Sequence, residues 1–144
     1  VWGPQTPLGA ARHLAYPRVR LVRWPADNDE LGKVCRGSRI VLGINTVNTI
    51  ERYFSNRTFL TLASGGFHLT HYVPGLEELF VNHRHLVWFH SDEECLELCA
   101  HYLGRDTARR RIADAGRAYV RRRWSMRRQA GVLLQAIEDI RAGA

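Results

Sequence analysis

The sequence lacks long apolar runs, a secretory signal and the glycine-rich loops that cradle phosphates in kinases and NAD enzymes. Its longest apolar stretch, residues 40–44, has the length of a strand, whereas a membrane-spanning helix needs about 18 residues or more. The chain also has no initiator methionine. We therefore expect a cytoplasmic piece of a longer protein that is neither a P-loop nor a dinucleotide-binding enzyme.

Cysteine is also scarce, and Cys35, Cys95 and Cys99 cannot all pair with one another. Cys95 and Cys99 fall on one face of a predicted helix, but two thiols without a third and fourth ligand make a poor zinc site. We expect buried, reduced thiols in a reducing compartment, with no metal and no cofactor.

Positive charge is present almost entirely as arginine, since Lys33 is the only lysine and the formal net charge is +7. Residues 105–128 hold ten arginines against Asp106 and Asp114, which gives this segment 10 − 2 = +8. Such a run binds the phosphates of nucleic acid or an anionic membrane, or forms the solvated face of packed helices. Periodic apolar residues and the lack of interleaved aromatics favour the solvated face. Weak contact with an anionic membrane stays open, and no nucleic acid is expected.

Strands are predicted over residues 18–24, 40–44, 67–72 and 86–89, after an irregular segment over residues 1–17. Helices are predicted over about 27–36 (capped by Asp27 or Asp29), 56–64 and 76–80, after Ser91 with a capping box, and twice more towards the end. The last two carry apolar stripes, the first at Ala108, Ile112, Ala115 and Tyr119, the second at Ala130, Leu133, Leu134, Ile137 and Ile140.

The alternation of strands and helices predicts an α/β fold over residues 1–144, with a Rossmann-like parallel sheet flanked by helices in a single domain. Ligands of such sheets bind at the carboxyl ends of the strands. These ends are predicted to lead into loops at Trp24, Asn45, Thr70 and His90.

Ser55, Asn56 and Arg57 begin a predicted helix directly after a strand and its loop. The first amides of a helix lack internal partners and carry a partial positive charge, so an anion is stabilised there. The arginine fork adds a group that suits phosphate oxygens. The residues alone equally allow Ser55 as a plain N-cap and Arg57 as a surface arginine.

Further candidates follow along the same stretch of chain. Gly65 and Gly66 either close the helix or let the backbone pass close to a nucleotide. Thr70, His71 and Tyr72 end a strand, where Tyr72 could stack on a base or a sugar. Glu78 could accept hydrogen bonds from sugar hydroxyls, although a solvated helix start explains it as well.

The ordered series RIVLGINT, SNRTFLTLASGG, FHLTHY, PGLEELF and RRRIADAG resembles the spore-maturation-protein-like branch of group 1 glycosyltransferases over residues 31–137. Arg57 and Phe59 match the family's R-x-F, Gly65 the glycine that ends this helix, and Glu78 and Phe80 part of its G-L-E-E-L-F. The resemblance implies the carboxy-terminal domain of a two-domain GT-B enzyme. That domain binds a nucleotide-diphosphate sugar without a metal, and an amino-terminal domain supplies most of the acceptor site.

One position departs from the resemblance. Relatives often carry Glu directly after the phenylalanine, where it commonly grips the ribose, and here the residue is Leu60. A leucine accepts no hydrogen bond, so either the ribose is recognised by other residues, with Asn45 and Asn48 as candidates, or donor binding is weakened or lost. A donor-binding domain that is inactive alone, a non-catalytic interaction module and an arginine-driven nucleic-acid binder are the three hypotheses, in that order.

Overall fold

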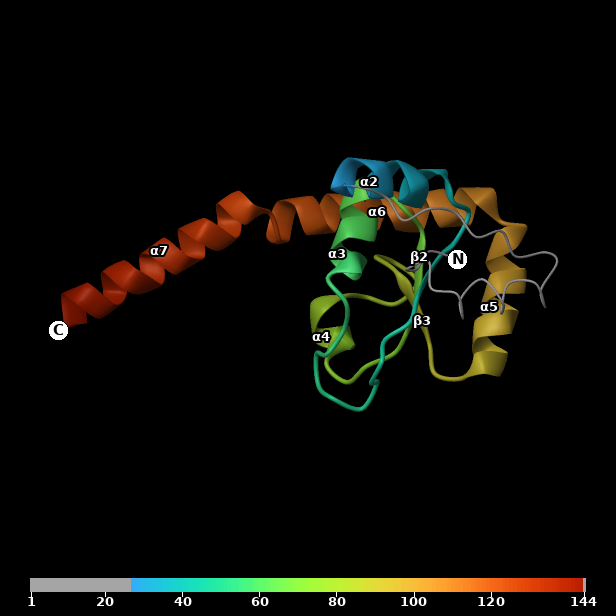
Figure 1. The fold of residues 1–144 in the computed structure, drawn as a ribbon, viewed down its shortest axis with the longest axis horizontal. Helices are drawn as coiled ribbons and strands as arrows, with labels where there is room; N and C mark the ends of the chain where they lie inside the picture. The colour runs from blue at the N-terminus through green and yellow to red at the C-terminus, as the bar shows by residue number, and fades with distance from the viewer. Residues whose placement is uncertain (1–26, 144) are drawn as a thin grey trace, which may run out of the picture. The chain divides into compact units, whose positions relative to one another are not determined.

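A computed structural model describes residues 27–143 of the chain (Figure 1). It divides into two compact units, residues 1–31 and 32–144, and only residues 27–31 of the first unit are described. The predicted irregular segment 1–17 and the predicted strand 18–24 lie outside the described residues. The single domain over residues 1–144 stays a prediction.

The described elements form an α/β fold with a parallel sheet, as predicted (Figure 1). They are helix α2 (Asn28–Gly37), strand β1 (Val41–Gly43), helix α3 (Arg57–Ser64), strand β2 (His68–His71), helix α4 (Leu76–Leu79), strand β3 (Val87–Phe89), and helices α5 (Asp92–Leu103), α6 (Asp106–Arg123) and α7 (Met126–Gly143). The strands lie in the order β1-β2-β3, with Leu42 opposite Leu69 and Thr70 opposite Trp88. All three carboxyl ends therefore meet at one edge of the sheet.

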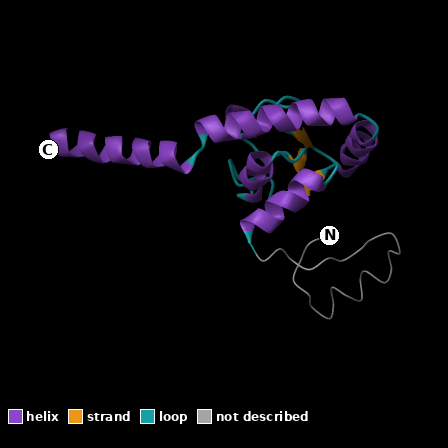
Figure 2. Cartoon of the chain, turned by 90° about the horizontal axis from the view of Figure 1, so that it is seen from above, coloured by secondary structure: helices purple, strands orange, loops and turns teal. Residues whose placement is uncertain are grey.

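Apolar side chains form two clusters, one on each face of the sheet. The first cluster consists of Phe67, Leu69, Val87, Phe89, Tyr102, Ile112 and Ala113. The second consists of Leu62, Val73, Leu76, Phe80, Leu86 and Val120. Helix α5 thus covers one face, α3 and α4 cover the other, and α6 contributes to both clusters; Figure 2 shows the short orange strands among these purple helices.

The start and end signals of several helices are confirmed. The Asp27 carboxylate accepts a hydrogen bond from the Glu30 amide at 2.8 Å, as expected of a cap. The Ser91 hydroxyl accepts from the Glu94 amide at 3.2 Å, and the Glu94 carboxylate accepts from the His90 amide at 2.7 Å. Gly65 ends α3 with a φ of 82°, a left-handed conformation that glycine adopts without strain.

An aromatic cluster fixes the first turn of α3. The Phe59 ring lies 5.8 Å from the rings of Phe54 and Phe80 and 5.5 Å from that of Trp124, measured between centroids. Aromatic pairs at these separations add to the stabilisation that comes from burial. The phenylalanine of the R-x-F pattern is therefore a structural anchor for the helix that Arg57 begins.

Strand β1 departs from the expectation that residues 40–44 are covered on both faces. Leu42 is 48% exposed and Ile44 is 73% exposed. Leu42 and Ile44 are two residues apart, which is the spacing of one face of a strand, so that face is open. A continuous apolar run therefore did not mean a strand that is covered on both faces.

The prediction that the arginines of residues 105–128 all point outward is wrong for Arg109, which is 5% exposed. Its guanidinium donates to the carbonyl oxygens of Tyr102 and Leu103 and pairs with the Asp106 carboxylate at 2.5 Å. These carbonyls belong to the last turn of α5, where a cation is favoured by the helix dipole. Arg109 therefore joins α5 to α6 from the inside.

The expectation that the apolar stripe of α7 packs into the core is also wrong for the described residues. Helix α7 contains no buried residue, and its large apolar side chains are exposed by 38% at Ile137 to 83% at Met126. Across residues 27–143, no helix has the length and apolar character needed to cross a membrane.

Candidate functional site

The candidate site lies at the edge of the sheet where the three parallel strands end, at Gly43, His71 and Phe89. Three connections leave this edge, over residues 44–56, 72–75 and 90–91. Ligands of parallel α/β sheets bind at this edge because no helix closes the space in front of the strands. Four of the ten predicted site residues lie on these connections, namely Asn45, Ser55, Asn56 and Tyr72.

The start of α3 is held to the end of β1 by an asparagine. The Asn45 carboxamide oxygen accepts a hydrogen bond from the Ser55 amide at 3.3 Å, and the Asn45 amide group donates to Asn48 at 3.4 Å. Ser55, Asn56 and Arg57 are thereby placed beside the strand end. This brings Asn45 together with the three residues predicted to hold a diphosphate.

The predicted N-cap is one residue early. Asn56 is the N-cap and makes no side-chain capping bond, so the helix begins at Arg57 rather than at Asn56. The Ser55 hydroxyl instead accepts from the Arg57 amide at 3.3 Å, across only two residues. The Arg57 amide and the Thr58 amide, which donates to the Ser55 carbonyl oxygen at 3.0 Å, therefore have partners within the chain, and an anion at this end is favoured mainly by the helix dipole.

Beneath this helix start lies a buried floor of polar side chains. The Thr58 hydroxyl and the His68 Nε2 atom are 3.2 Å apart, and both side chains are nearly fully buried. A Cβ atom on Gly43 would lie 2.7 Å from the His68 ring and 2.8 Å from the Thr70 hydroxyl. Burial lowers the pKa of His68 to about 4, so the ring is neutral near pH 7. The floor is therefore uncharged and leaves no room for a side chain at Gly43.

A second group of side chains at the same edge is aromatic. The Tyr72 ring lies 4.6 Å from the His90 ring and 5.9 Å from the Trp88 ring. The His71 Nδ1 atom is 2.8 Å from the Tyr72 carbonyl oxygen, to which it donates, and its ring meets Phe89 edge to face. Thr70 belongs to the polar floor and Tyr72 to this aromatic group, where a ring face can stack on a base or a sugar. His71 instead contacts Phe89 of the first cluster, on the other face of the sheet.

Two acidic side chains of α4 have protein partners of their own. A hydrogen bond with Glu77 raises the pKa of the Tyr72 hydroxyl. Glu78, a predicted sugar contact, forms an ion pair with Arg52. Sequence reasoning missed Arg52, because the two partners are 26 residues apart and share no local pattern.

Gly65 and Gly66 lie away from this edge, at the far end of α3. An eight-residue helix is about 12 Å long, so these glycines do not meet Ser55 or Arg57. A Cβ atom on Gly66 would lie 2.9 Å from the Cys35 carbonyl oxygen. The structure therefore gives the two glycines roles in ending α3 and in packing against α2.

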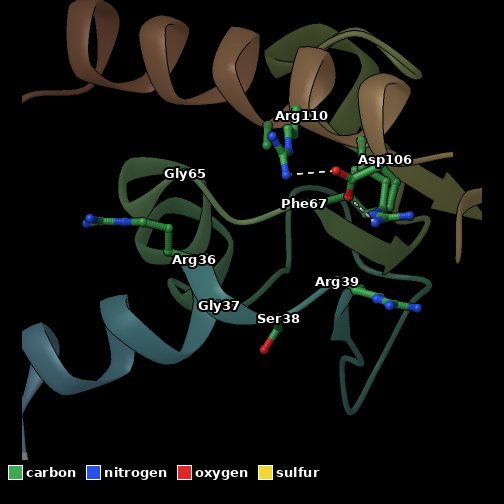
Figure 3. Close-up of a pocket in the computed structure, with 10 residues that line it drawn as sticks. Arg36, Gly37, Ser38, Arg39, Gly65, Phe67, Asp106 and Arg110 are labelled. Atoms are coloured by element: carbon green, nitrogen blue, oxygen red, sulfur yellow. Dashed lines mark hydrogen bonds and ion pairs between the residues drawn. The ribbon is translucent and has the colours of Figure 1, made fainter.

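A shallow pocket of about 200 Å³ lies at this opposite edge, between the ends of α2 and α3 and the start of α6 (Figure 3). It is lined mostly by charged and small residues, namely Arg36, Gly37, Ser38, Arg39, Gly65, Phe67, Asp106, Arg109, Arg110 and Ala113. Arg110 pairs with Asp106 at 2.8 Å, and Figure 3 shows Arg36 and Arg39 extending in opposite directions. The guanidinium groups therefore do not converge on one ligand.

Residues 27–143 hold no group of three or more histidine, cysteine, aspartate or glutamate residues arranged to bind a metal ion. The three cysteines are free thiols. Burial raises the pKa of Cys95 to about 11, and burial also raises that of Cys35. Thiols with raised pKa values are poor nucleophiles near neutral pH.

The chain matches one protein family but no curated protein. Residues 1–135 match the model of the family described as glycosyl transferase-like. The match covers nearly the whole sequence, including both groups of side chains at the carboxyl edge.

Solved structures share this fold at low sequence identity. HepE from Anabaena, solved with UDP and glucose, superposes with a TM-score of 0.73 and 14% identity over 91% of this chain. Sucrose-phosphate synthase from Thermosynechococcus elongatus superposes with a TM-score of 0.77 and 15% identity over 99% of this chain. The chain spans only 34% and 38% of these two proteins, respectively, and their fold is that of GT-B glycosyltransferases.

Proposed function

Because the chain belongs to the glycosyl transferase-like family, we propose that it is the donor-binding domain of a GT-B glycosyltransferase. Its ligand is a nucleotide-diphosphate sugar, held at the carboxyl edge of the sheet. HepE, which shares the fold, was solved with UDP and with UDP and glucose. These complexes support a nucleoside diphosphate as the ligand class.

The start of α3 is the observation that carries this proposal. Asn45 fixes it beside the end of β1 through the Ser55 amide, and Asn56, at the N-cap position, makes no side-chain capping bond. Arg57 is exposed at this point and adds a positive charge to the helix dipole. An anion with two phosphates fits a helix start of this kind.

The chemical role of this site is to stabilise the leaving group. The nucleoside diphosphate gains negative charge as the bond to the sugar breaks, and helix amides with Arg57 stabilise that charge in the transition state. This scheme needs no metal. Tyr72 and its aromatic neighbours are placed to contact the base or the sugar.

The rest of the active site is proposed to lie on an amino-terminal domain. The chain spans little more than a third of the neighbouring structures, so a cleft between two domains needs residues from elsewhere. We assign no catalytic base to the described residues and expect the isolated chain to bind without transferring sugar. The half-buried Leu60 supplies no hydrogen bond for a ribose, which leaves Asn45 and Asn48 as the nearby amides.

The test is a titration of the chain with UDP, GDP, TDP and ADP, followed by calorimetry or NMR. Arg57→Ala is expected to weaken binding of the preferred nucleotide by about 1.5–3 kcal/mol, through loss of charge-assisted hydrogen bonds. Arg121→Ala, on the exposed face of α6, is the matched control and is expected to change affinity less than twofold at about 0.15 M salt, because distant exposed charges are screened. Equal affinities of wild type and Arg57→Ala would remove Arg57 from the phosphate site.

A second candidate is an interaction module that keeps the fold without the chemistry. The exposed apolar stripe of α7 favours it, since single helices rarely leave several large apolar side chains in water without a partner. Under this hypothesis no nucleotide binds, and Leu60 marks a lost ribose contact. Saturable binding of one nucleotide that depends on Arg57 would reject it.

A further inference from the structure

An ion pair ties the connection after β1 to helix α4, and the same arginine, Arg52, also has its Nε atom 3.8 Å from a carboxylate oxygen of Glu51. Arg52 lies on the connection between β1 and α3, and Glu78 lies in the first turn of α4. The Arg52 guanidinium donates to the Glu78 carboxylate, and both side chains are 53% exposed. An arginine side chain is thus displayed at the same edge as the start of α3, five residues before Arg57.

The backbone holds Arg52 in this position. Its φ is 55°, one of two positive values among the described non-glycine residues, and its amide donates to the Pro74 carbonyl oxygen at 2.8 Å. Its side chain passes over Gly75, where a Cβ atom would lie 2.9 Å from the Arg52 Cγ atom. Left-handed backbone at a non-glycine residue is uncommon and often marks functional sites. The conformation delivers the guanidinium to one defined place.

Glu78, the partner of Arg52, is a carboxylate that a phosphate group can replace. A guanidinium fork binds carboxylate and phosphate oxygens in the same geometry. Glu78 presents one negative charge, whereas a diphosphate presents at least two. An exposed carboxylate also gains little from such a pair, because water screens the attraction. A diphosphate bound at the start of α3 therefore competes well for the same guanidinium.

We propose that Glu78 is an internal stand-in for phosphate, which holds Arg52 until the diphosphate of the nucleotide takes the carboxylate's place. Arg52 is then a second phosphate-binding arginine, beside Arg57, and Glu78 lowers the affinity for the ligand by competition. This inference rests on the proposed nucleotide site at the start of α3. It predicts opposite effects for the two partners, whereas a purely structural ion pair predicts weaker binding for either change.

The experiment titrates the chain with inorganic pyrophosphate and with UDP by calorimetry at low salt. Glu78→Gln is expected to tighten pyrophosphate binding about two- to fivefold, the range that corresponds to releasing an exposed ion pair. Arg52→Ala is expected to weaken binding about tenfold or more. The double variant is expected to bind like Arg52→Ala, because the released partner is gone. Glu97→Gln, which removes the same charge from the exposed face of α5, is the control for net charge.

The outcomes separate this inference from the proposed function. If UDP binding depends on Arg57 while Glu78→Gln leaves affinity unchanged or weakens it, the inference is overturned and the donor site stands. If Glu78→Gln tightens pyrophosphate through Arg52 but UDP is not preferred over pyrophosphate, the inference stands and the nucleotide assignment falls. If neither ligand binds any variant, both are overturned.

Discussion

Helices α6 and α7 follow one another, have 18 residues each and carry apolar side chains at helical spacing, yet only α6 is buried. In α6 the buried set is Arg109, Ile112, Ala113, Gly116 and Val120, whereas α7 has none. The comparison shows that apolar residues at a 3.6-residue spacing predict an amphipathic helix, but they do not predict which element, if any, packs against its apolar face.

Each helix carries a glycine, and the two glycines have different surroundings. A Cβ atom on Gly116 of α6 would lie 2.2 Å from the His85 carbonyl oxygen, so this helix touches the chain before β3 directly. Gly131 of α7 has nothing within 4 Å of the same position. Close approach of α6 therefore depends on a glycine at the contact, and α7 makes no such contact.

The largest expected difference in stability is between two glycine-to-alanine substitutions, one in each helix. Gly116→Ala is expected to lower the free energy of unfolding by about 3 kcal/mol or more, because a backbone atom must move. Gly131→Ala is expected to raise it by about 0.5–1 kcal/mol, because alanine favours an exposed helix over glycine. Urea unfolding followed by circular dichroism measures both. Shifts in the same direction would contradict the contrast between the helices.

The next pair of variants replaces one isoleucine by alanine in the apolar stripe of α6 and one in that of α7. Ile112→Ala is expected to cost about 3 kcal/mol, since Ile112 is 2% exposed and its loss leaves a cavity. Ile140→Ala is expected to change stability by about 0.5 kcal/mol or less, since Ile140 is 72% exposed. Urea unfolding measures both variants, and their midpoints can be compared directly if the dependence of the unfolding free energy on urea concentration is the same. Similar costs would show that α7 is packed in solution.

The sequence predicted the order of strands and helices well, because apolar periods and end signals such as Asp27, Ser91 and Gly65 are local. Which side chains are buried could not be predicted in the same way, because burial depends on contacts between elements that are distant in the sequence. The exposed face of β1, the buried Arg109 and the uncovered α7 each depend on which element packs against them, and no local pattern encodes that.

The candidate site divides in the same way. The start of α3 after β1 was predictable from strand, loop and helix order, although the cap came one residue later than Ser55. The Tyr72 and His90 ring contact and the pairing of Arg52 with Glu78 join residues from different connections. Whether the residues at this edge hold a nucleotide, and whether the chain belongs to the spore-maturation-protein-like branch, stay predictions.

A third pair tests the two kinds of arginine in the basic segment. Arg109→Met is expected to cost about 2 kcal/mol, because it leaves the carbonyl oxygens of Tyr102 and Leu103 without their donor. Arg128→Met, at an exposed position of α7, is expected to cost less than about 0.5 kcal/mol. Thermal unfolding at two salt concentrations checks both. A large, salt-dependent loss at Arg128 would mean that the exposed arginines stabilise the fold.

The smallest effect is expected from removing α7 altogether. A chain that ends at Ser125 keeps Trp124, whose ring packs 5.5 Å from Phe59, and loses no buried side chain. Its melting temperature is expected to change by less than about 2 °C, since 1 kcal/mol corresponds to roughly 2–8 °C for chains of this size. A fall of more than about 5 °C would show that the stripe of α7 is covered in solution. An unchanged melting temperature, with the nucleotide titration also unchanged, would mean that the six large apolar side chains of α7 serve neither the fold of residues 32–123 nor the site. Their partner would then lie outside the described residues, and the proposed amino-terminal domain is the first one to test.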